Sequence, residues 1–211
     1  LRGVCALPDV HNEGAYTRLI LDFRASDDVL NFVNGQNVSD VSQRGVITPD
    51  HTIRTKNWPL VLPAPQDGKA EAFAQAARQA VAAFIAHYQD YFTRNNARVG
   101  GSRVMLDPAP RVALVPGLGL FGMGTNAKAA GIAADLAEAA VDAITNAEAI
   151  GRFESISESD MFDCEYWPLE QAKLGAAKPL PLAGQIAVIT GGGGAIGAAT
   201  ASAFAKAGAE V

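Results

Sequence analysis

Two glycine-rich segments have residue types and spacing that suit phosphate binding. The first matches the pattern G-x-G-x-x-G through Gly117, Gly119 and Gly122. The second contains Thr190, Gly191, Gly192, Gly193, Gly194, Ala195, Ile196 and Gly197. A glycine-rich turn that opens a helix directs backbone N–H groups and the positive end of the helix dipole toward an anion. An apolar run precedes each segment and a helical pattern follows it, so each predicts a strand, a loop and a helix.

The second segment is the stronger candidate. Ile186–Ile189 has the apolar content of a buried strand, and Ala195–Lys206 has a helical pattern that Gly208 ends. Its small residues let a pyrophosphate approach the backbone closely. We therefore predict a cofactor-binding site at Thr190–Gly197, and the alternative is a tight turn that holds no ligand.

The first segment carries large apolar side chains at Leu118, Leu120 and Phe121. A phosphate loop usually has small residues at such positions, so we first expect a structural turn here. An anion or substrate site at the three glycines is an alternative, and a dinucleotide site is another.

A polar segment, Thr48–Lys56, combines His51, Arg54 and Lys56. Arginine and lysine bind phosphate or carboxylate, and histidine exchanges protons or binds metal. The segment therefore suits a substrate or anion site for a sugar phosphate. The alternative is an ordered surface loop in which His51 is hydrogen-bonded to nearby backbone.

We expect no metal site and no catalytic pair of carboxylates. The other histidines, His11 and His87, lie far from His51 along the chain, and the two cysteines form no C-x-x-C pair. In the acidic segment 160–170, we expect Asp163 and Glu165 either to face solvent or to pair with Arg54 or Lys56. Residue 87 belongs to an aromatic stripe that we expect in the core.

The elements that must position these residues alternate between helices and single strands. We expect strands at 17–24 and 111–115, helices at 26–35 and 69–92, a long helix after the first glycine segment, short helices from 145, 157 and 168, and a linker at 176–184. We expect loops and short strands between 41 and 68. Alternation of this kind predicts an α/β fold, a Rossmann-like three-layer domain with a mainly parallel sheet. An incomplete strand–loop–helix of a second Rossmann domain follows it.

Composition narrows the class of protein. The chain has 211 residues, is 49% apolar and carries a net charge of −5. That size suits one domain, or one domain and part of another, and the negative charge argues against general nucleic-acid binding. We see no signal peptide and no membrane span, so we expect a cytoplasmic protein.

Residues 182–211 resemble the opening of a short-chain dehydrogenase/reductase. That family's T-G-x-x-x-G-x-G motif is matched by Thr190, Gly191 and Gly197, with Ala195 in place of the middle glycine. The resemblance implies NAD or NADP as cofactor. The family's Tyr-x-x-x-Lys pair is missing, so we expect this piece to be inactive and to bind no cofactor itself.

A wider resemblance covers nearly the whole chain. Residues 44–56, 107–122 and 161–175 resemble the middle of two-part proteins that join a class II aldolase to a short-chain dehydrogenase in rhamnulose-phosphate-type sugar catabolism. This resemblance implies that the chain is an internal piece of such a two-part protein. Residues 1–178 would form a connecting domain, and residues 179–211 would form the truncated start of the dehydrogenase. The aldolase domain, with its metal and phosphate motifs, would precede Leu1 in the same polypeptide, and the substrate would be sugar-derived.

Two other functions stay open for the main domain. It could be a non-catalytic docking domain, with a homodimer as one arrangement. It could instead be a sugar-phosphate-binding domain that uses Thr48–Lys56.

Overall fold

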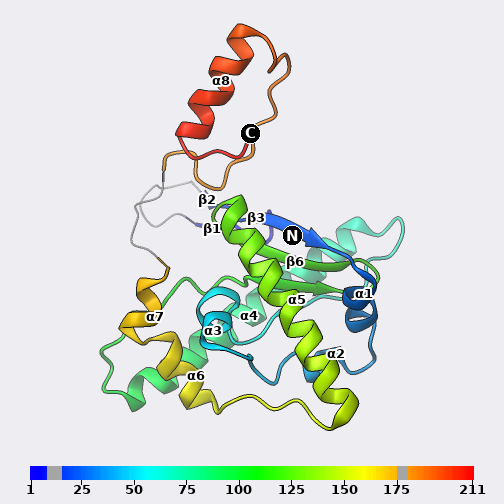
Figure 1. The fold of residues 1–211 in the computed structure, drawn as a ribbon, viewed down its shortest axis with the longest axis vertical. Coiled ribbons are helices and arrows are strands. Elements are labelled where there is room, and N and C mark those ends of the chain that lie inside the picture. Colours follow the sequence, from blue (N-terminus) through cyan, green and yellow to red (C-terminus); the bar gives the residue numbers. More distant parts are fainter. Residues whose placement is uncertain (9–15, 175–179) are drawn as a thin grey trace.

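The computed structural model describes residues 1–8, 16–174 and 180–211 (Figure 1). Its strands are β1 (Leu7–Pro8), β2 (Tyr16–Thr17), β3 (Ile20–Arg24), β4 (Leu60–Val61), β5 (Val112–Val115) and β6 (Gly119–Gly124). Its helices are α1 (Asp27–Val33), α2 (Val38–Val41), α3 (Pro49–Thr55), α4 (Ala70–Arg98), α5 (Ala127–Ile150), α6 (Glu158–Glu165), α7 (Pro168–Ala172) and α8 (Ala195–Lys206).

The main sheet has the strand order β3-β6-β5-β4. Strand β6 runs antiparallel to both β3 and β5, and only β4 pairs in parallel with β5. The α/β class is confirmed at this level. The prediction of a mainly parallel sheet is wrong, and the small mixed sheet does not confirm a Rossmann-like fold.

The first glycine segment explains this difference. Gly117 has a φ of 78°, and the N–H of Leu118 donates to the carbonyl of Val115 at 3.0 Å, which closes a turn. The chain then returns as strand β6 rather than entering a helix. The order is therefore strand, turn, strand and helix, and a hairpin connection of this kind makes the two strands antiparallel.

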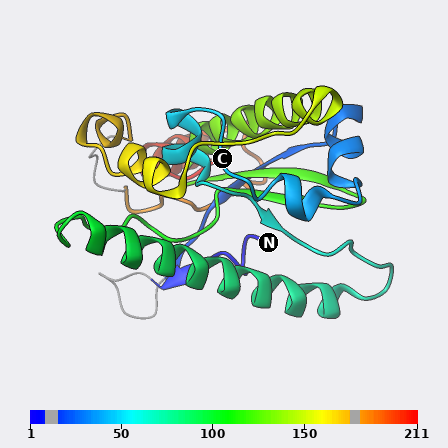
Figure 2. The same cartoon turned by 90° about the horizontal axis from the view of Figure 1, so that it is seen from below.

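Helices α4 and α5 lie on opposite faces of the sheet, as Figure 2 shows. Gly122 and Gly124 face α5, and a Cβ on either would overlap its backbone. On α4, Phe84, Tyr88 and Tyr91 are buried as predicted, but His87, which was expected in the same core stripe, is exposed. These contacts make three layers around the sheet.

Local capping signals predicted several helix starts correctly. The side chains of Ser26 and Ser157 accept from the N–H groups of Val29 and Asp160 at the starts of α1 and α6. The helix predicted from Thr145 is not separate, because α5 continues without a break to Ile150. Strand β4 lies in the region 41–68 that was expected to hold loops and short strands, but that region also contains helix α3, and helix α2 ends where the region begins.

Residues 180–211 form an extension, made of an extended segment, a loop and helix α8, that projects from the main body in Figure 1. Helix α8 has the predicted bounds, and none of its residues is buried. The predicted strand Ile186–Ile189 is wrong, since it contains only a single parallel bridge, from Ile186 to Glu210. Positions 176–179 of the predicted linker lie outside the described residues. No helix in the described part of the chain is long and apolar enough to cross a membrane.

Candidate functional site

The segment Thr48–Lys56 is mostly helix α3 rather than a surface loop. His51 is 3% exposed; its Nδ1 lies 2.8 Å from the hydroxyl of Thr48, and its Nε2 lies 3.0 Å from the carbonyl oxygen of Leu136. Because a carbonyl only accepts, Nε2 carries the hydrogen and Nδ1 accepts from Thr48. Burial also lowers the pKa of His51. Both ring nitrogens are therefore engaged: Nδ1 at the start of α3, and Nε2 in holding α3 against α5.

The three candidate anion-binding side chains do not converge. Arg54 extends outward and donates to the carbonyl of Lys173 at 3.3 Å. Lys56 points inward and is 4% exposed. His51 and Lys56 line one small, mostly apolar cavity, but Arg54 does not, so the three side chains do not form a common anion site.

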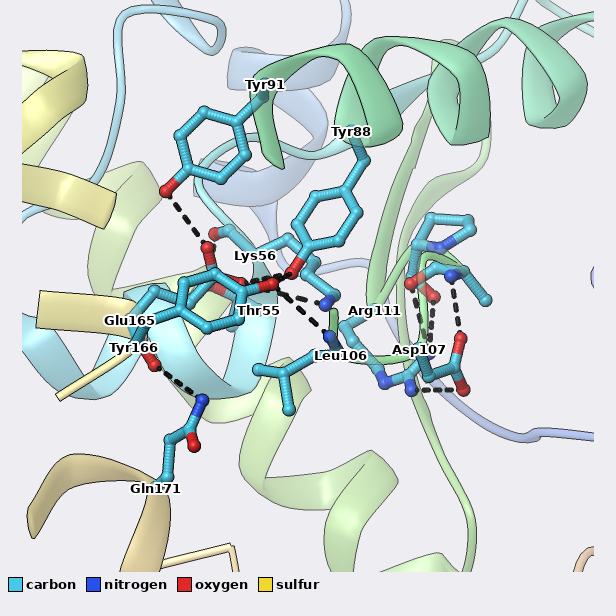
Figure 3. A network of polar contacts seen from close by, with 12 residues as sticks. Thr55, Lys56, Tyr88, Tyr91, Leu106, Asp107, Arg111, Glu165, Tyr166 and Gln171 are labelled. Atoms are coloured by element: carbon cyan, nitrogen blue, oxygen red, sulfur yellow. Dashed lines mark hydrogen bonds and ion pairs between the residues drawn. The ribbon is translucent and has the colours of Figure 1, made fainter. Parts of the chain in front are cut away.

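Lys56 instead lies in a buried cluster with Glu165, Tyr88, Tyr91 and Tyr166 (Figure 3). We name these five residues the lysine–glutamate cluster. The Nζ of Lys56 lies 3.7 Å from Oε1 of Glu165 and 4.0 Å from the ring centre of Tyr88. Glu165 was expected either to face solvent or to pair with residue 54 or 56, and the structure places it against Lys56. Glu165 is fully buried.

Hydroxyl groups complete the coordination of the carboxylate. Tyr88 donates to Oε1 of Glu165 at 2.6 Å, and Tyr91 donates to Oε2 at 3.0 Å. The hydroxyls of Tyr166 and Tyr88 lie 2.8 Å apart, and the N–H of Leu106 donates to Tyr166 at 3.3 Å. With Leu106 donating and Glu165 accepting, the consistent direction of donation runs from Leu106 through both tyrosines to Glu165. Helix α4, helix α6 and the α3–β4 junction each supply part of the cluster.

Burial dominates the electrostatics of this cluster. It lowers the pKa of Lys56 to about 8, although Glu165 opposes that shift. It raises the pKa of Glu165, against the opposing effects of Lys56 and the tyrosines. Burial and the nearby carboxylate also raise the pKa of Tyr166 to about 12, so that hydroxyl stays protonated at neutral pH. The pKa values of the amine and the carboxyl are thus both shifted toward neutral pH from their ordinary values.

The backbone at Lys56 is unusual. Its φ is 67°, and it is the only residue other than glycine with a positive φ in the described part of the chain. Side chains rarely adopt this conformation, and residues held in it are often found at functional sites. The turn ends α3 and directs the amine toward α4.

The residues after Lys56 were not predicted as functional. Asn57 is 1% exposed, and neither its Oδ1 nor its Nδ2 has a hydrogen-bond partner. The indole N–H of Trp58 also has none. The only sequence signal was a lysine and an asparagine placed directly before an apolar strand, and that pattern is too common to be diagnostic.

The glycines of the first segment serve packing. Gly119 abuts the carbonyl of Arg24, and Gly122 abuts α5, so a Cβ at either position would overlap backbone. The N–H of Gly117 donates to the side chain of Asn34 at 2.7 Å. These contacts support the structural-turn interpretation, and an anion site at these glycines stays a prediction.

The second segment does form a glycine turn before a helix. The carbonyl of Gly191 accepts from Gly194 at 2.9 Å, and a Cβ on Gly197 would overlap that same carbonyl. Gly197 therefore allows the close approach expected of this motif. Whether Thr190–Gly197 holds a phosphate stays a prediction. Among the described residues, no three His, Cys, Asp or Glu side chains are grouped so as to hold a metal ion. His11 lies outside those residues.

Residues 1–174 match the family described as Aldolase class II, second domain. The chain therefore belongs to the class II aldolase family. A protein of Bacillus subtilis (strain 168) named "Uncharacterized oxidoreductase YuxG" is 36% identical over 196 residues, which cover 92% of this chain and 28% of that protein. The chain thus spans little more than a quarter of that relative. No solved structure gives a significant match.

The family match corrects the prediction of a short-chain dehydrogenase fragment. It assigns residues 1–174 to an aldolase class, and the relative is named only as an uncharacterized oxidoreductase. The expected short-chain dehydrogenase, Rossmann and NAD(P) character finds no support in these comparisons. That prediction rested on the motif of the last thirty residues and on a wider resemblance of residues 44–56, 107–122 and 161–175, whereas the family match assigns residues 1–174 to the aldolase class itself.

Proposed function

We propose that the chain binds a small hydroxy-carbonyl compound as part of a larger class II aldolase-family protein, with Lys56 and Glu165 exchanging protons with that compound. An aldol reaction makes or breaks a carbon–carbon bond next to a carbonyl, and it requires proton transfer to and from oxygen. The observation that carries the proposal is the buried amine of Lys56, 3.7 Å from Glu165 and 4.0 Å from the ring centre of Tyr88.

The chemistry of the cluster supports proton exchange. An amine with a pKa of about 8 is present in both charge states near neutral pH, which is the property required of an acid–base group. The hydroxyl of Tyr88 contacts both Glu165 and Tyr166, so it links the carboxylate to a second hydroxyl. Substrate would reach Lys56 only after the junction between α3 and β4 opens, because the side chains there are buried.

A second candidate function is structural. Both oxygens of Glu165 already accept hydrogen bonds, and the cluster ties α4, α6 and the α3–β4 junction together. In that case the cluster stabilises the domain and binds nothing. The two candidates differ in whether a ligand recognises the amine.

The test is a calorimetric titration of the 211-residue chain with dihydroxyacetone and glycolaldehyde, at pH 7 and pH 9. We expect binding that changes with pH as Lys56 loses its proton. Lys56→Met is expected to raise the dissociation constant at least tenfold, about 1.4 kcal/mol. Lys128→Met, which alters an exposed lysine of α5, serves as the matched control and is expected to bind normally.

Two results would favour the structural candidate. One is the absence of binding to either compound by the wild-type chain at both pH values. The other is binding that is equal in the wild type and in folded Lys56→Met. Far-ultraviolet circular dichroism of each variant shows whether it is folded.

A further inference from the structure

Helix α5 has 24 residues and begins at Ala127 without an acidic residue in its first turn. The first turns of α1 and α6, by contrast, contain two carboxylates each, at Asp27 and Asp28 and at Glu158 and Asp160. Backbone N–H groups at a helix start lack partners within the helix and carry partial positive charge, so they attract an anion. An anion at the start of α5 must therefore come from another part of the chain or from a ligand.

A carboxylate from a distant segment occupies this position. Oε1 of Glu210 accepts from the N–H of Ala127 at 2.7 Å, and the two residues are 83 positions apart. The side chain of the cap residue, Asn126, accepts from the N–H of Ala129 at 2.8 Å and leaves the first N–H to Glu210. The backbone N–H of Lys128 donates to no group in the described part of the chain. The start of α5 thus holds an oxyanion already and has a further N–H available.

The segment that carries Glu210 has few contacts with the main body. Arg2 donates to the carbonyl of Gly184, and Gly184 abuts the carbonyl of Arg18. None of the residues of α8 is buried, and no described residue of 180–211 belongs to the three clusters of buried apolar residues. A free anion can therefore displace the carboxylate without disturbing the core.

We propose that the N-terminus of α5 is a binding site for a phosphate-type oxyanion, and that Glu210 occupies this site as an internal competitor. The N–H groups of Ala127 and Lys128 donate to two oxygens of the bound anion, as is usual for phosphate at a helix start. Phosphate competes well because it has more acceptor oxygens and more charge than the single carboxylate oxygen that it replaces. Helix α5 covers the face of the sheet opposite α4 (Figure 2), so this site is separate from the lysine–glutamate cluster and does not rest on the proposed function.

The test is a titration of the 211-residue chain with inorganic phosphate, in which nuclear magnetic resonance follows the backbone amide signals of Ala127 and Lys128. We expect Glu210→Gln to bind phosphate roughly tenfold more tightly than wild type, because a tethered competitor has been removed. Glu71→Gln makes the same change of charge at the exposed start of α4 and serves as the matched control, which should bind as wild type does. Repeating the titration with methyl phosphate shows whether the site takes free phosphate alone or also the phosphate group of a larger molecule.

A second variant tests the donor. Adding Ala127→Pro to Glu210→Gln removes the N–H that now donates to Glu210, and proline is well tolerated at the first position of a helix. We expect this double variant to lose most of the affinity that Glu210→Gln gains.

The other results overturn the proposal. Equal phosphate affinity in wild type and Glu210→Gln shows that Glu210 does not compete, and an equal gain in Glu71→Gln shows that net charge alone is responsible. Phosphate-dependent shifts that do not include the start of α5, or a double variant that binds as tightly as Glu210→Gln, place the anion elsewhere. Circular dichroism shows whether each variant is folded, and if the double variant is not, the comparison of Glu210→Gln with Glu71→Gln decides.

Discussion

Lys56 and Glu165 illustrate what burial does to a pair of opposite charges. Each charge loses hydration, and their attraction repays this cost only when other hydrogen bonds satisfy the remaining atoms. The hydroxyls of Tyr88 and Tyr91 meet that need at the carboxylate. The ring of Tyr88 also lies 4.0 Å from the amine, where a cation is attracted to the aromatic face. The pair therefore depends on α4 as much as on its own two residues.

Residue types alone could predict only part of this site. Pairing of Glu165 with a cation at 54 or 56 was one of the two alternatives that the sequence left open, and the structure shows the pair with Lys56. The tyrosines of α4 were correctly expected in the core, but their hydroxyls were not expected to be functional. Tyr88 and Glu165 are 77 positions apart, and no periodicity in the chain relates them. Only the packing of α4 on α6 brings them together.

The pair should make stability depend on pH. The pKa of Lys56 is about 8 when folded, below its ordinary value of 10.5, so between these values the unfolded chain binds more protons. The free energy of unfolding therefore rises with pH across this window, by roughly 3 kcal/mol at most. Glu165, whose pKa is raised, has the opposite sign, and its contribution falls as pH rises above the ordinary value of 4.5.

Urea unfolding at pH 8 and pH 10 checks this, with the double variant Lys56→Met/Glu165→Gln as reference. The reference keeps the tyrosines, so their own titration largely cancels in the difference. Wild type should gain stability relative to the reference as pH rises. A difference that stays constant between the two pH values would show that Lys56 is not held at a lowered pKa.

At the scale of elements, the sequence correctly predicted those helix boundaries that depend on neighbouring residues in the chain. The starts of α1 and α6 follow from the serine caps directly before them, and the start of α8 follows from the glycine turn before it. The hairpin between β5 and β6 was missed, because G-x-G-x-x-G is compatible with either a helix or a strand after the loop. The choice depends on pairing between β6 and β3, which come from distant parts of the chain.

We therefore expect the glycines of β6 to affect the stability of the fold through their packing against α5. Gly122→Ala places a Cβ against the backbone of Ala130 and Ala134 in α5, where neither neighbour is the end of a flexible side chain. We expect it to lower the free energy of unfolding by about 1–3 kcal/mol, as overpacking does. Gly131→Ala is the control, since it lies inside α5 with only the carboxylate of Asp22 near its Cβ. It should stabilise by about 0.5–1 kcal/mol, because alanine favours helix.

Chemical denaturation of both variants measures these two effects. If Gly122→Ala lowers the free energy of unfolding and Gly131→Ala raises it, then glycine is required at position 122 because of the contact between the sheet and α5. A neutral Gly122→Ala would mean that α5 moves away from the sheet at little cost, and the packing explanation would then be wrong.

At the scale of the molecule, the described chain has one main body and an extension. The three clusters of buried apolar residues contain no described residue beyond Tyr166. Residues 180–211 contact the body through Gly184 against Arg18 and through Glu210, whose carboxylate accepts from the N–H of Ala127 at 2.7 Å. The family match likewise ends at residue 174. The boundary predicted between 178 and 179 lies just beyond these limits.

A chain ending at Leu174 should consequently fold as stably as the whole. It loses surface contacts such as those of Gly184 and Glu210, each worth no more than about 1 kcal/mol, and it keeps every residue of the three clusters. We expect its free energy of unfolding in urea to lie within about 1 kcal/mol of the longer chain, with the same affinity for dihydroxyacetone because the lysine–glutamate cluster is complete. In the longer chain, Val188 and Ile196 are 91% and 85% exposed, so their removal should also reduce binding of a hydrophobic dye. A large loss of stability on truncation would instead make residues 180–211 an integral part of the aldolase-family domain, and the predicted boundary would then be wrong.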